Sequence, residues 1–227
     1  MSGPPGSRGS GPELTSAGED YLKAIFELGG ELVRTQDLAE LLGVSPASVT
    51  GMLRKLAGLG LIGYEPYAGA SLTPAGRKVA LETLRHHRLI ETYLAEALGY
   101  QWFEVHDEAE KLEHHISEEF EDRIASALGH PHFDPHGDPI PGRDGSLPLQ
   151  RGEPLALMPL DVELEITWIG RLPVTQLRAL DGHGILPGGV VRLTALDSNG
   201  SAVVHGDAGP VQLSAEAVSQ IAARALS

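Results

Sequence analysis

Imidazole and carboxylate side chains recur at helical spacing between residues 87 and 114. Residues three or four positions apart lie on one face of a helix, so each such pair directs a nitrogen and an oxygen donor to the same point. The sets are His87 with Glu91, His106 with Glu110, and Glu110 with Glu113 and His114. Mixed imidazole and carboxylate donors suit first-row divalent metal ions, and carboxylate-rich sets favour harder ions such as Mn2+. The spacing therefore predicts helices that carry a metal site.

A single pair of this kind is weak evidence, because the exposed faces of helices commonly carry His and Glu. Three linked sets on neighbouring helices are more specific, and they favour a metal site over a solvated helix face. The remaining histidines fit less well. His86 and His115 point away from the shared face by one residue. The linker histidines His130, His132 and His136 are compatible with a short metal-binding tract, but a segment that wraps the helical domain is the favoured interpretation.

The chain is strongly acidic, but its charge is unevenly distributed. The formal net charge of −14 over 227 residues argues against general nucleic-acid binding, because phosphate contacts need local positive charge. Acidic residues crowd positions 82–122, whereas positions 34–78 carry five basic and three acidic side chains. A DNA-binding face is therefore compatible with the second stretch, and the first stretch suits cation capture.

Cysteine is absent from the sequence, which excludes disulfides and thiolate metal ligands and is typical of a cytoplasmic protein. No apolar run reaches the roughly 18 residues of a membrane span. Residues 1–13 are rich in Gly, Pro and Ser and lack an apolar segment, which predicts a disordered tail and not a secretory signal. We therefore expect a cytoplasmic protein without membrane association.

Residues 14–80 predict a small helical domain with a β-hairpin. Helices are expected over residues 19–28, 35–43 and 45–60, and two strands around a turn at Ala68-Gly69 follow. In the third helix, Ser45 suits the N-cap and Pro46 the first turn. Helix, tight turn, helix and hairpin make up a winged helix-turn-helix, whose second motif helix enters the major groove of DNA.

The third helix presents small side chains to a DNA groove. The residues predicted to meet base edges are Ser45, Pro46, Ala47, Ser48 and Thr50, and those predicted to meet phosphates are Arg54 and Lys55. Hydroxyls and small apolar groups read bases less strongly than a bidentate arginine does, so DNA shape and phosphate contacts carry much of the expected specificity. A helical packing module without a DNA role is the alternative.

The rest of the chain predicts a helical domain, a linker and a small β-domain. Two or three long helices are expected over residues 74–128 and reach into the helical domain of residues 81–130; one pattern covers 73–99 and the next covers 105–129. Their apolar residues predict a two-fold symmetric dimer, and include Leu94, Leu98, Ile116, Phe120 and Ile124. Residues 131–154 read as a Pro/Gly-rich linker. Alternating patterns such as Val162–Ile166 predict a small barrel over 155–227, with a closing helix over 214–226.

Several motifs together resemble one known family. They are EDYLKAIFEL, LAELLGVSPASVTGMLRKLAGLGLI, LTPAGRKVA, HRLIETYL, VHDEAEKLEHHIS and PHGDPIPG. In these motifs the chain resembles the iron- and manganese-dependent repressors of the diphtheria-toxin-repressor family, over nearly its whole length. The resemblance implies a mainly α fold: a winged helix-turn-helix domain and a helical metal-binding and dimerisation domain, followed by an SH3-like (FeoA-like) β-barrel domain.

The resemblance also implies two metal sites. The ancillary site would use His87, Glu91 and His106, and the primary site Asp20, Glu110, Glu113 and His114. Some relatives add a Glu and a Gln from the C-terminal domain, for which Glu165 and Gln176 are weak candidates. Iron-type members generally carry Met and Cys where this chain has Asp20 and Glu110. Oxygen in place of sulfur favours Mn2+, and Fe2+ remains the alternative.

The sequence thus predicts a homodimeric regulator that binds a pseudo-palindromic operator in double-stranded DNA when Mn2+ is bound, and that controls metal-homeostasis genes. An Fe2+-responsive repressor of the same family is the nearest alternative. A winged-helix repressor that senses an organic ligand would need an apolar pocket between domains. A di-metal carboxylate enzyme would need two Glu-x-x-His helices around a core site, whereas Glu-x-x-Glu-His occurs once and no nucleophile is evident, so we expect no enzyme.

Overall fold

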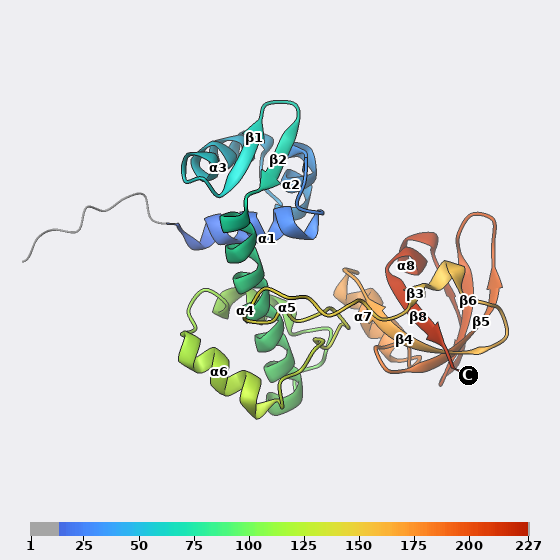
Figure 1. Cartoon of the computed structure of the whole chain (residues 1–227). Helices are drawn as coiled ribbons and strands as arrows, with labels where there is room; N and C mark the ends of the chain where they lie inside the picture. Colours follow the sequence, from blue (N-terminus) through green and yellow to red (C-terminus); the bar gives the residue numbers. More distant parts are fainter. Residues whose placement is uncertain (1–13, 227) are drawn as a thin grey trace, which may run out of the picture. The chain divides into compact units, whose positions relative to one another are not determined.

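The computed structural model describes residues 14–226. The tail predicted to be disordered, residues 1–13, lies outside the described residues. The chain forms two compact units, one up to Leu84 and one from Arg85 onward, and each is described here by itself (Figure 1). The boundary falls inside the longest helix, α4 (Pro74–Leu98), so this helix begins in the first unit and ends in the second.

The first unit is a winged helix-turn-helix. Its helices are α1 (Ser16–Glu27), α2 (Thr35–Leu42) and α3 (Pro46–Gly58), and the largest side chains of its core are Leu22, Ile25, Leu38, Leu53 and Leu56. Gly43 ends α2 in the left-handed conformation with φ of 64°. Ser45 caps α3 by accepting a hydrogen bond from the Ser48 N–H (3.2 Å), and Pro46 fills the first turn. The three predicted helices are confirmed.

The wing is a hairpin of β1 (Ile62–Glu65) and β2 (Gly69–Leu72), extended by a bridge from Val33 to Ala70. Of the predicted turn residues, Ala68 lies in the turn, whereas Gly69 belongs to β2 and pairs with Glu65. Gly69 is required there, since a β-carbon would lie 2.7 Å from the backbone of Leu32. The turn itself consists of Pro66, Tyr67 and Ala68.

In the second unit, α4 packs with α5 (His106–Leu112) and α6 (Glu118–Ala127). Of the two or three long helices predicted over residues 74–128, three are present, and the pattern that ends at Gly129 is divided between Leu112 and Glu118. Ser117 begins the new helix, where its hydroxyl accepts a hydrogen bond from the Phe120 N–H (3.2 Å). Capping by a hydroxyl competes with continuation of the helix. The periodicity of apolar residues does not reveal such a cap.

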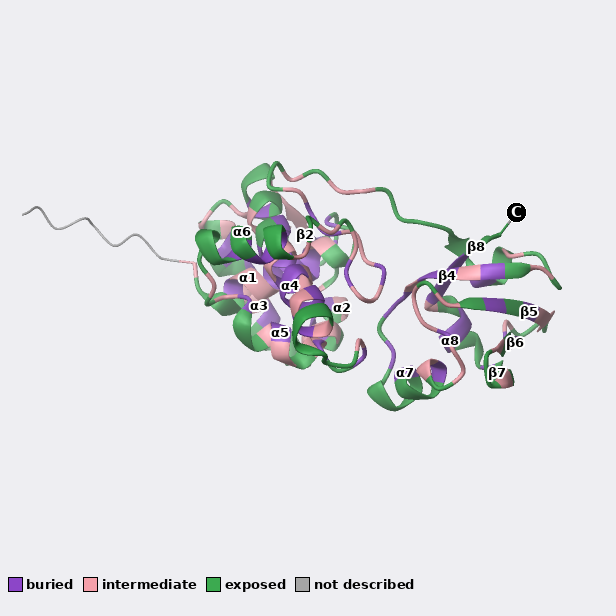
Figure 2. Cartoon of the chain, turned by 90° about the horizontal axis from the view of Figure 1, so that it is seen from below, coloured by how far each residue is buried: buried purple, intermediate pink, exposed green. Residues whose placement is uncertain are grey.

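The C-terminal part of this unit is a six-stranded antiparallel sheet with strand order β3-β8-β4-β5-β6-β7, consistent with an SH3-like domain. The strands are β3 (Glu153–Pro154), β4 (Glu163–Ile169), β5 (Val190–Leu196), β6 (Ala202–Gly206), β7 (Gly209–Leu213) and β8 (Ile221–Ala225). This domain also contains a short 3-10 helix, η1 (Leu155–Leu157), and two α-helices, α7 (Val174–Asp181) and α8 (Ala215–Ser219). Figure 2 colours the chain by burial, and β4 is mostly buried, with half-buried residues between the buried ones.

The predicted closing helix over 214–226 is mostly wrong. Only α8 is helical, and Ile221–Ala225 forms a strand that pairs with both β4 and β3. Ala-rich sequence favours a helix locally. Here Ile221 and Ala223 fill the sheet core instead, so tertiary packing overrides local preference.

Two loops connect the helices of this unit to the sheet. Trp102 donates a hydrogen bond from its indole N–H to Asp181 (2.7 Å), and Phe103 is buried in the core of the sheet domain. The Ile169 N–H donates to the His136 carbonyl (2.9 Å). The loop after α4 is thereby fixed to α7 and to the core of the sheet domain, and the loop that contains His136 is fixed to β4. Within residues 14–226 there is no helix of the length and apolarity that a bilayer span requires.

A buried ion-pair network joins α4 to α6. The Glu121 carboxylate, 3% exposed, lies 2.5 Å from Arg85 Nε and 3.0 Å from His86 Nε2. Arg85 also donates to the Pro141 carbonyl (2.7 Å). Burial opposes ionisation of Glu121, but hydrogen bonds from His86 and Arg85 lower its pKa from 4.5 to about 2. The ionised carboxylate is thus part of the native packing.

We predict that Glu121→Gln lowers the free energy of unfolding by roughly 3 kcal/mol at neutral pH, because it leaves buried cations without their partner. A carboxyl whose pKa is depressed in the fold stabilises above its ordinary pKa of 4.5 and loses that effect as the pH falls towards 2. The difference between wild type and variant should therefore shrink over this window in denaturant unfolding. Glu119→Gln, on an exposed pair with Arg123, is the control and should cost under about 1 kcal/mol. Equal losses for both variants would contradict the prediction.

Candidate metal centre

His87 lies at the centre of a cluster of donor atoms in the second unit. It is 5% exposed on α4, and its Nδ1 contacts the Glu113 carboxylate. Its Nε2 lies 3.0 Å from Oε1 of Glu91, one turn further along α4, and 3.1 Å from Nδ1 of His106 at the start of α5. Helical spacing therefore places His87 and Glu91 on one face, as predicted, and α5 brings His106 to them.

Glu110 completes the cluster from its solvent side. Its Oε1 lies 3.8 Å from His106 Nε2 and 3.9 Å from His87 Nδ1. One donor atom from each of these three residues lies within 4.8 Å of the other two. Donors bound to one first-row ion at about 2.1 Å are separated by at most about 4.2 Å, so small side-chain rotations suffice to bind an ion. His106 and Glu110 are 42% and 38% exposed, which leaves a path for entry.

The two predicted metal sites are contiguous. Glu113, assigned by resemblance to the primary site, touches His87 of the ancillary site, and Glu113 Oε1 lies 3.4 Å from His114 Nε2. All six predicted donors of the second unit therefore belong to one connected group of oxygen and nitrogen atoms. Asp20 lies on α1 in the first unit, and its part in metal binding is a proposal.

The electrostatics of the cluster favour a cation. Burial of Glu91 raises its pKa, but the adjacent imidazoles of His87, His106 and His136 outweigh burial and hold the pKa well below its usual range. Burial lowers the pKa of His136 although Glu91 is near. An ionised carboxylate is the form of this side chain that binds a metal ion.

Two residues of the predicted linker lie beside this cluster, and the sequence analysis assigned neither of them to a metal site. His136 Nδ1 lies 3.9 Å from Glu91 Oε2, and Asp134 offers a third donor atom within 4.8 Å of both. Asp134 also has a structural role, because it accepts hydrogen bonds from the His136 and Asp138 N–H groups and pairs with Arg88. The Asp-Pro-His spacing was visible in the sequence, but it was interpreted as a wrapping segment.

The other candidates lie outside the cluster. Glu165 pairs with Arg224 on the neighbouring strand (2.6 Å), and Gln176 is exposed on α7. His86 binds Glu121. In residues 14–226, neither His130 nor His132 belongs to a group of donors close enough to share an ion. The structure therefore does not place these polar residues among the donors of the cluster.

The predicted DNA face lies on α3 in the first unit. Pro46, Ala47 and Ser48 are exposed at its N-terminal end, and Arg54 and Lys55 are exposed further along. The Ser45 hydroxyl serves as the cap, and the half-buried Thr50 donates its hydroxyl to the Pro46 carbonyl (3.0 Å). The exposed part of the face is therefore small and mostly uncharged at its N-terminal end.

Comparisons with known proteins match both units. Residues 13–70 match the model of the iron-dependent repressor N-terminal DNA-binding domain, and residues 73–142 match the metal-binding and dimerisation domain of the same family. An uncharacterised helix-turn-helix transcriptional regulator of Methanocaldococcus jannaschii is 39% identical over 109 residues, which cover 47% of this chain and 87% of that protein. The chain belongs to the iron-dependent repressor family.

Two further relatives show the range of this family. The diphtheria toxin repressor of Corynebacterium glutamicum is 36% identical over 132 residues, 57% of this chain and 58% of that protein. A manganese-dependent transcriptional repressor in complex with manganese superimposes with a TM-score of 0.81 at 38% identity, and the match covers 92% of this chain and all of the other. The predicted family is confirmed, and with it a metal-dependent DNA-binding repressor that is not an enzyme.

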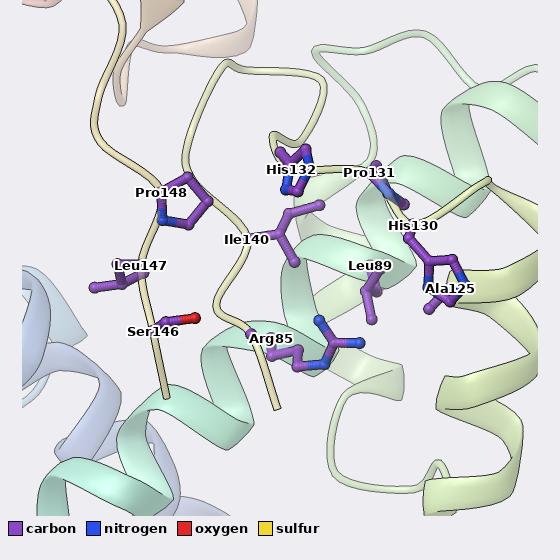
Figure 3. Close-up of a pocket in the computed structure, with 11 residues that line it drawn as sticks. Arg85, Leu89, Ala125, His130, Pro131, His132, Ile140, Ser146, Leu147 and Pro148 are labelled. Atoms are coloured by element: carbon purple, nitrogen blue, oxygen red, sulfur yellow. The ribbon is translucent and has the colours of Figure 1, made fainter. Parts of the chain in front are cut away.

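Membership of the iron-dependent repressor family also bears on the organic-ligand alternative. The second unit contains a hollow of about 440 Å³ beneath residues 130–148 (Figure 3). Its lining includes Leu89, Ala125 and Ile140, and its arginine, Arg85, is already bound by Glu121 and by the Pro141 carbonyl. The hollow lies within one unit and not between domains, and the effector of the family is a metal ion.

We predict that Mn2+ raises the thermal midpoint of chelator-treated protein, because an ion that binds only the folded cluster stabilises it by about 3 kcal/mol at a hundredfold excess over its dissociation constant. His87→Ala should remove most of this rise, since the imidazole contacts three other donors. His115→Ala removes an exposed imidazole nearby and serves as the control. An unchanged Mn2+ effect in His87→Ala would show that the ion binds elsewhere.

Proposed function

We propose that this member of the family is a manganese-responsive homodimeric repressor of metal-homeostasis genes. The observation that carries the proposal is the donor cluster itself, in which imidazoles and carboxylates supply every donor and sulfur supplies none. Oxygen-rich sets favour harder ions. The solved structure of a manganese-dependent repressor with manganese supports the same metal. Fe2+ is the second candidate, because the family model is that of iron-dependent repressors.

Asp20 would link metal binding to DNA binding. By family resemblance it joins Glu110, Glu113 and His114 around an ion, so that the ion ties α1 of the DNA-binding unit to α5 of the second unit. Without the ion, the arrangement that binds DNA would be a minor population, and the ion would raise that population by its preference for it. The contiguous donors around His87 support a second ion in the same centre.

The repressor would act as a dimer on a pseudo-palindromic operator in double-stranded DNA. Large apolar side chains remain exposed on the helices of the second unit, among them Leu98 (56%), Leu112 (38%) and Phe120 (47%). Leu94 and Ile124, also expected at the dimer surface, are instead buried within the protomer. A two-fold dimer would place its two α3 helices one DNA turn apart, roughly 34–36 Å. Because its target is DNA, we expect a cytoplasmic protein.

We predict that Mn2+ raises the affinity of chelator-treated protein for its operator by at least tenfold at fixed salt, because the ion selects the DNA-binding arrangement. The operator can be selected from random duplexes with the Mn2+-loaded protein. Binding is then measured by fluorescence anisotropy with Mn2+, Fe2+ under anaerobic conditions, and chelator. Salt must stay constant, since phosphate contacts make affinity steeply salt-dependent. Equal affinity in Mn2+ and in chelator would refute a metal-dependent repressor.

The choice of metal is tested at Glu110. Glu110→Ala should weaken Mn2+ binding and operator binding together while the fold persists, because the side chain lies at a partly exposed edge. Combining Glu110→Cys with Asp20→Met should shift the response from Mn2+ towards Fe2+, since thiolate and thioether are softer donors.

Glu108→Ala is the matched control for these variants. Glu108 is a carboxylate on the same helix that pairs with Lys111 at 3.0 Å. Removing it should leave both titrations unchanged. If Glu110→Ala responded to Mn2+ as Glu108→Ala does, Glu110 would be no ligand and the manganese assignment would lose its main support.

A further inference from the structure

Tyr67 occupies a backbone position that disfavours its own side chain. It follows Pro66 in the wing turn, where the Ala68 N–H donates to the Glu65 carbonyl (3.1 Å), and its φ is 71°. A turn with Pro second and a positive φ third is the type II pattern, which calls for Gly or Asn at the third position. A tyrosine there is strained, because its β-carbon crowds the backbone.

Nothing within its own unit compensates for this strain. Tyr67 is fully exposed, more so than any other large hydrophobic side chain among residues 14–226. Tyr64, three residues earlier, shows the contrast, because it packs against the core of the unit. Local conformation and folding stability therefore both disfavour Tyr67, and the residue that suits them is glycine. A side chain that lowers folding stability and makes no buried contact within its own protein is expected to contact another molecule.

The chemistry of the first unit indicates what it meets. Residues 14–84 carry six basic and eight acidic side chains. Several of the basic ones are engaged: Lys23 is buried, Arg34 is paired with Asp37 (2.6 Å), and Arg77 lies over the Phe26 ring (4.8 Å). A DNA-binding unit so poor in exposed cations needs uncharged contacts to the sugar–phosphate backbone, and tyrosine hydroxyls make such contacts.

We propose that Tyr67 is a DNA contact, with its ring packed on a deoxyribose and its hydroxyl donating to a phosphate oxygen beside the groove that α3 enters. This rests on the DNA-binding role of the family and adds a specific residue to it. The wing tip carries Glu65 two residues away and no basic side chain between Tyr64 and Leu72. The contact is therefore uncharged, and it releases no counterion when it forms.

Three variants of the full chain test the proposal, each with Mn2+ and an operator duplex selected by wild-type protein. Tyr67→Gly and Tyr67→Asn both suit the turn, so each should raise the thermal midpoint by roughly 2–4 °C. Both should also weaken operator binding by roughly tenfold. Tyr67→Phe keeps the ring and loses the hydroxyl, so it should weaken binding by roughly fivefold with an unchanged midpoint.

The salt dependence of binding separates this contact from a charged one. The slope of log affinity against log salt should stay at the wild-type value in every Tyr67 variant, whereas Lys55→Ala should reduce it by about one. Asp161→Gly is the matched backbone control: Asp161 is exposed with φ of 60°, but it lies in the second unit. That variant should leave operator binding unchanged.

Each alternative has its own signature. Wild-type affinity in Tyr67→Gly, or a lowered thermal midpoint, would overturn the proposal. So would a Tyr67→Gly protein that binds DNA normally but fails to dimerise in light scattering, because the side chain would then meet a second copy. Failure of the wild-type protein itself to bind any selected duplex with Mn2+ would overturn the repressor function, and the Tyr67 contact with it.

Discussion

The buried imidazole of His87, held between the carboxylates of Glu91 and Glu113, is the contact on which the second unit depends. Removing carboxylates from water costs several kcal/mol each unless opposite charge compensates for it. Imidazoles compensate in part when they are protonated. A divalent cation compensates at any pH at which its ligands are deprotonated. The composition and burial of the cluster therefore suit a metal ion, as proposed above.

Local spacing predicted which of these side chains lie close together. His87 and Glu91 share one turn of α4, and His106 and Glu110 share one turn of α5, whereas Glu113 and His114 follow the end of α5 at Leu112. The winged helix-turn-helix followed from equally local signals, including the Ser45 cap and the left-handed Gly43. Element order in the first 98 residues needed no long-range information.

What the sequence could not predict depended on distant contacts. Asp134 and His136 reach the cluster because Arg88 on α4 pairs with Asp134 and because the Ile169 N–H of β4 donates a hydrogen bond to the His136 carbonyl. The composition of Ile221–Ala225 favours a helix. The segment is nevertheless a strand, because it pairs with β3 and β4 and buries side chains in the core of the sheet domain. The break after Leu112 depends on a cap at Ser117 that competes with an otherwise continuous helical pattern.

The uneven charge of the chain connects the metal centre to the DNA face. The net charge of −14 repels phosphates at long range, and the first unit has few exposed cations to offset it. Each divalent ion bound at the proposed centre would cancel two of these charges, so metal binding would weaken that repulsion in addition to selecting the proposed arrangement of the units. A strongly basic DNA-binding unit would hold DNA with or without the ion. An acidic chain with small, largely uncharged contacts on α3 and at Tyr67 makes its affinity sensitive to the metal, and that sensitivity is what a metal-responsive repressor requires.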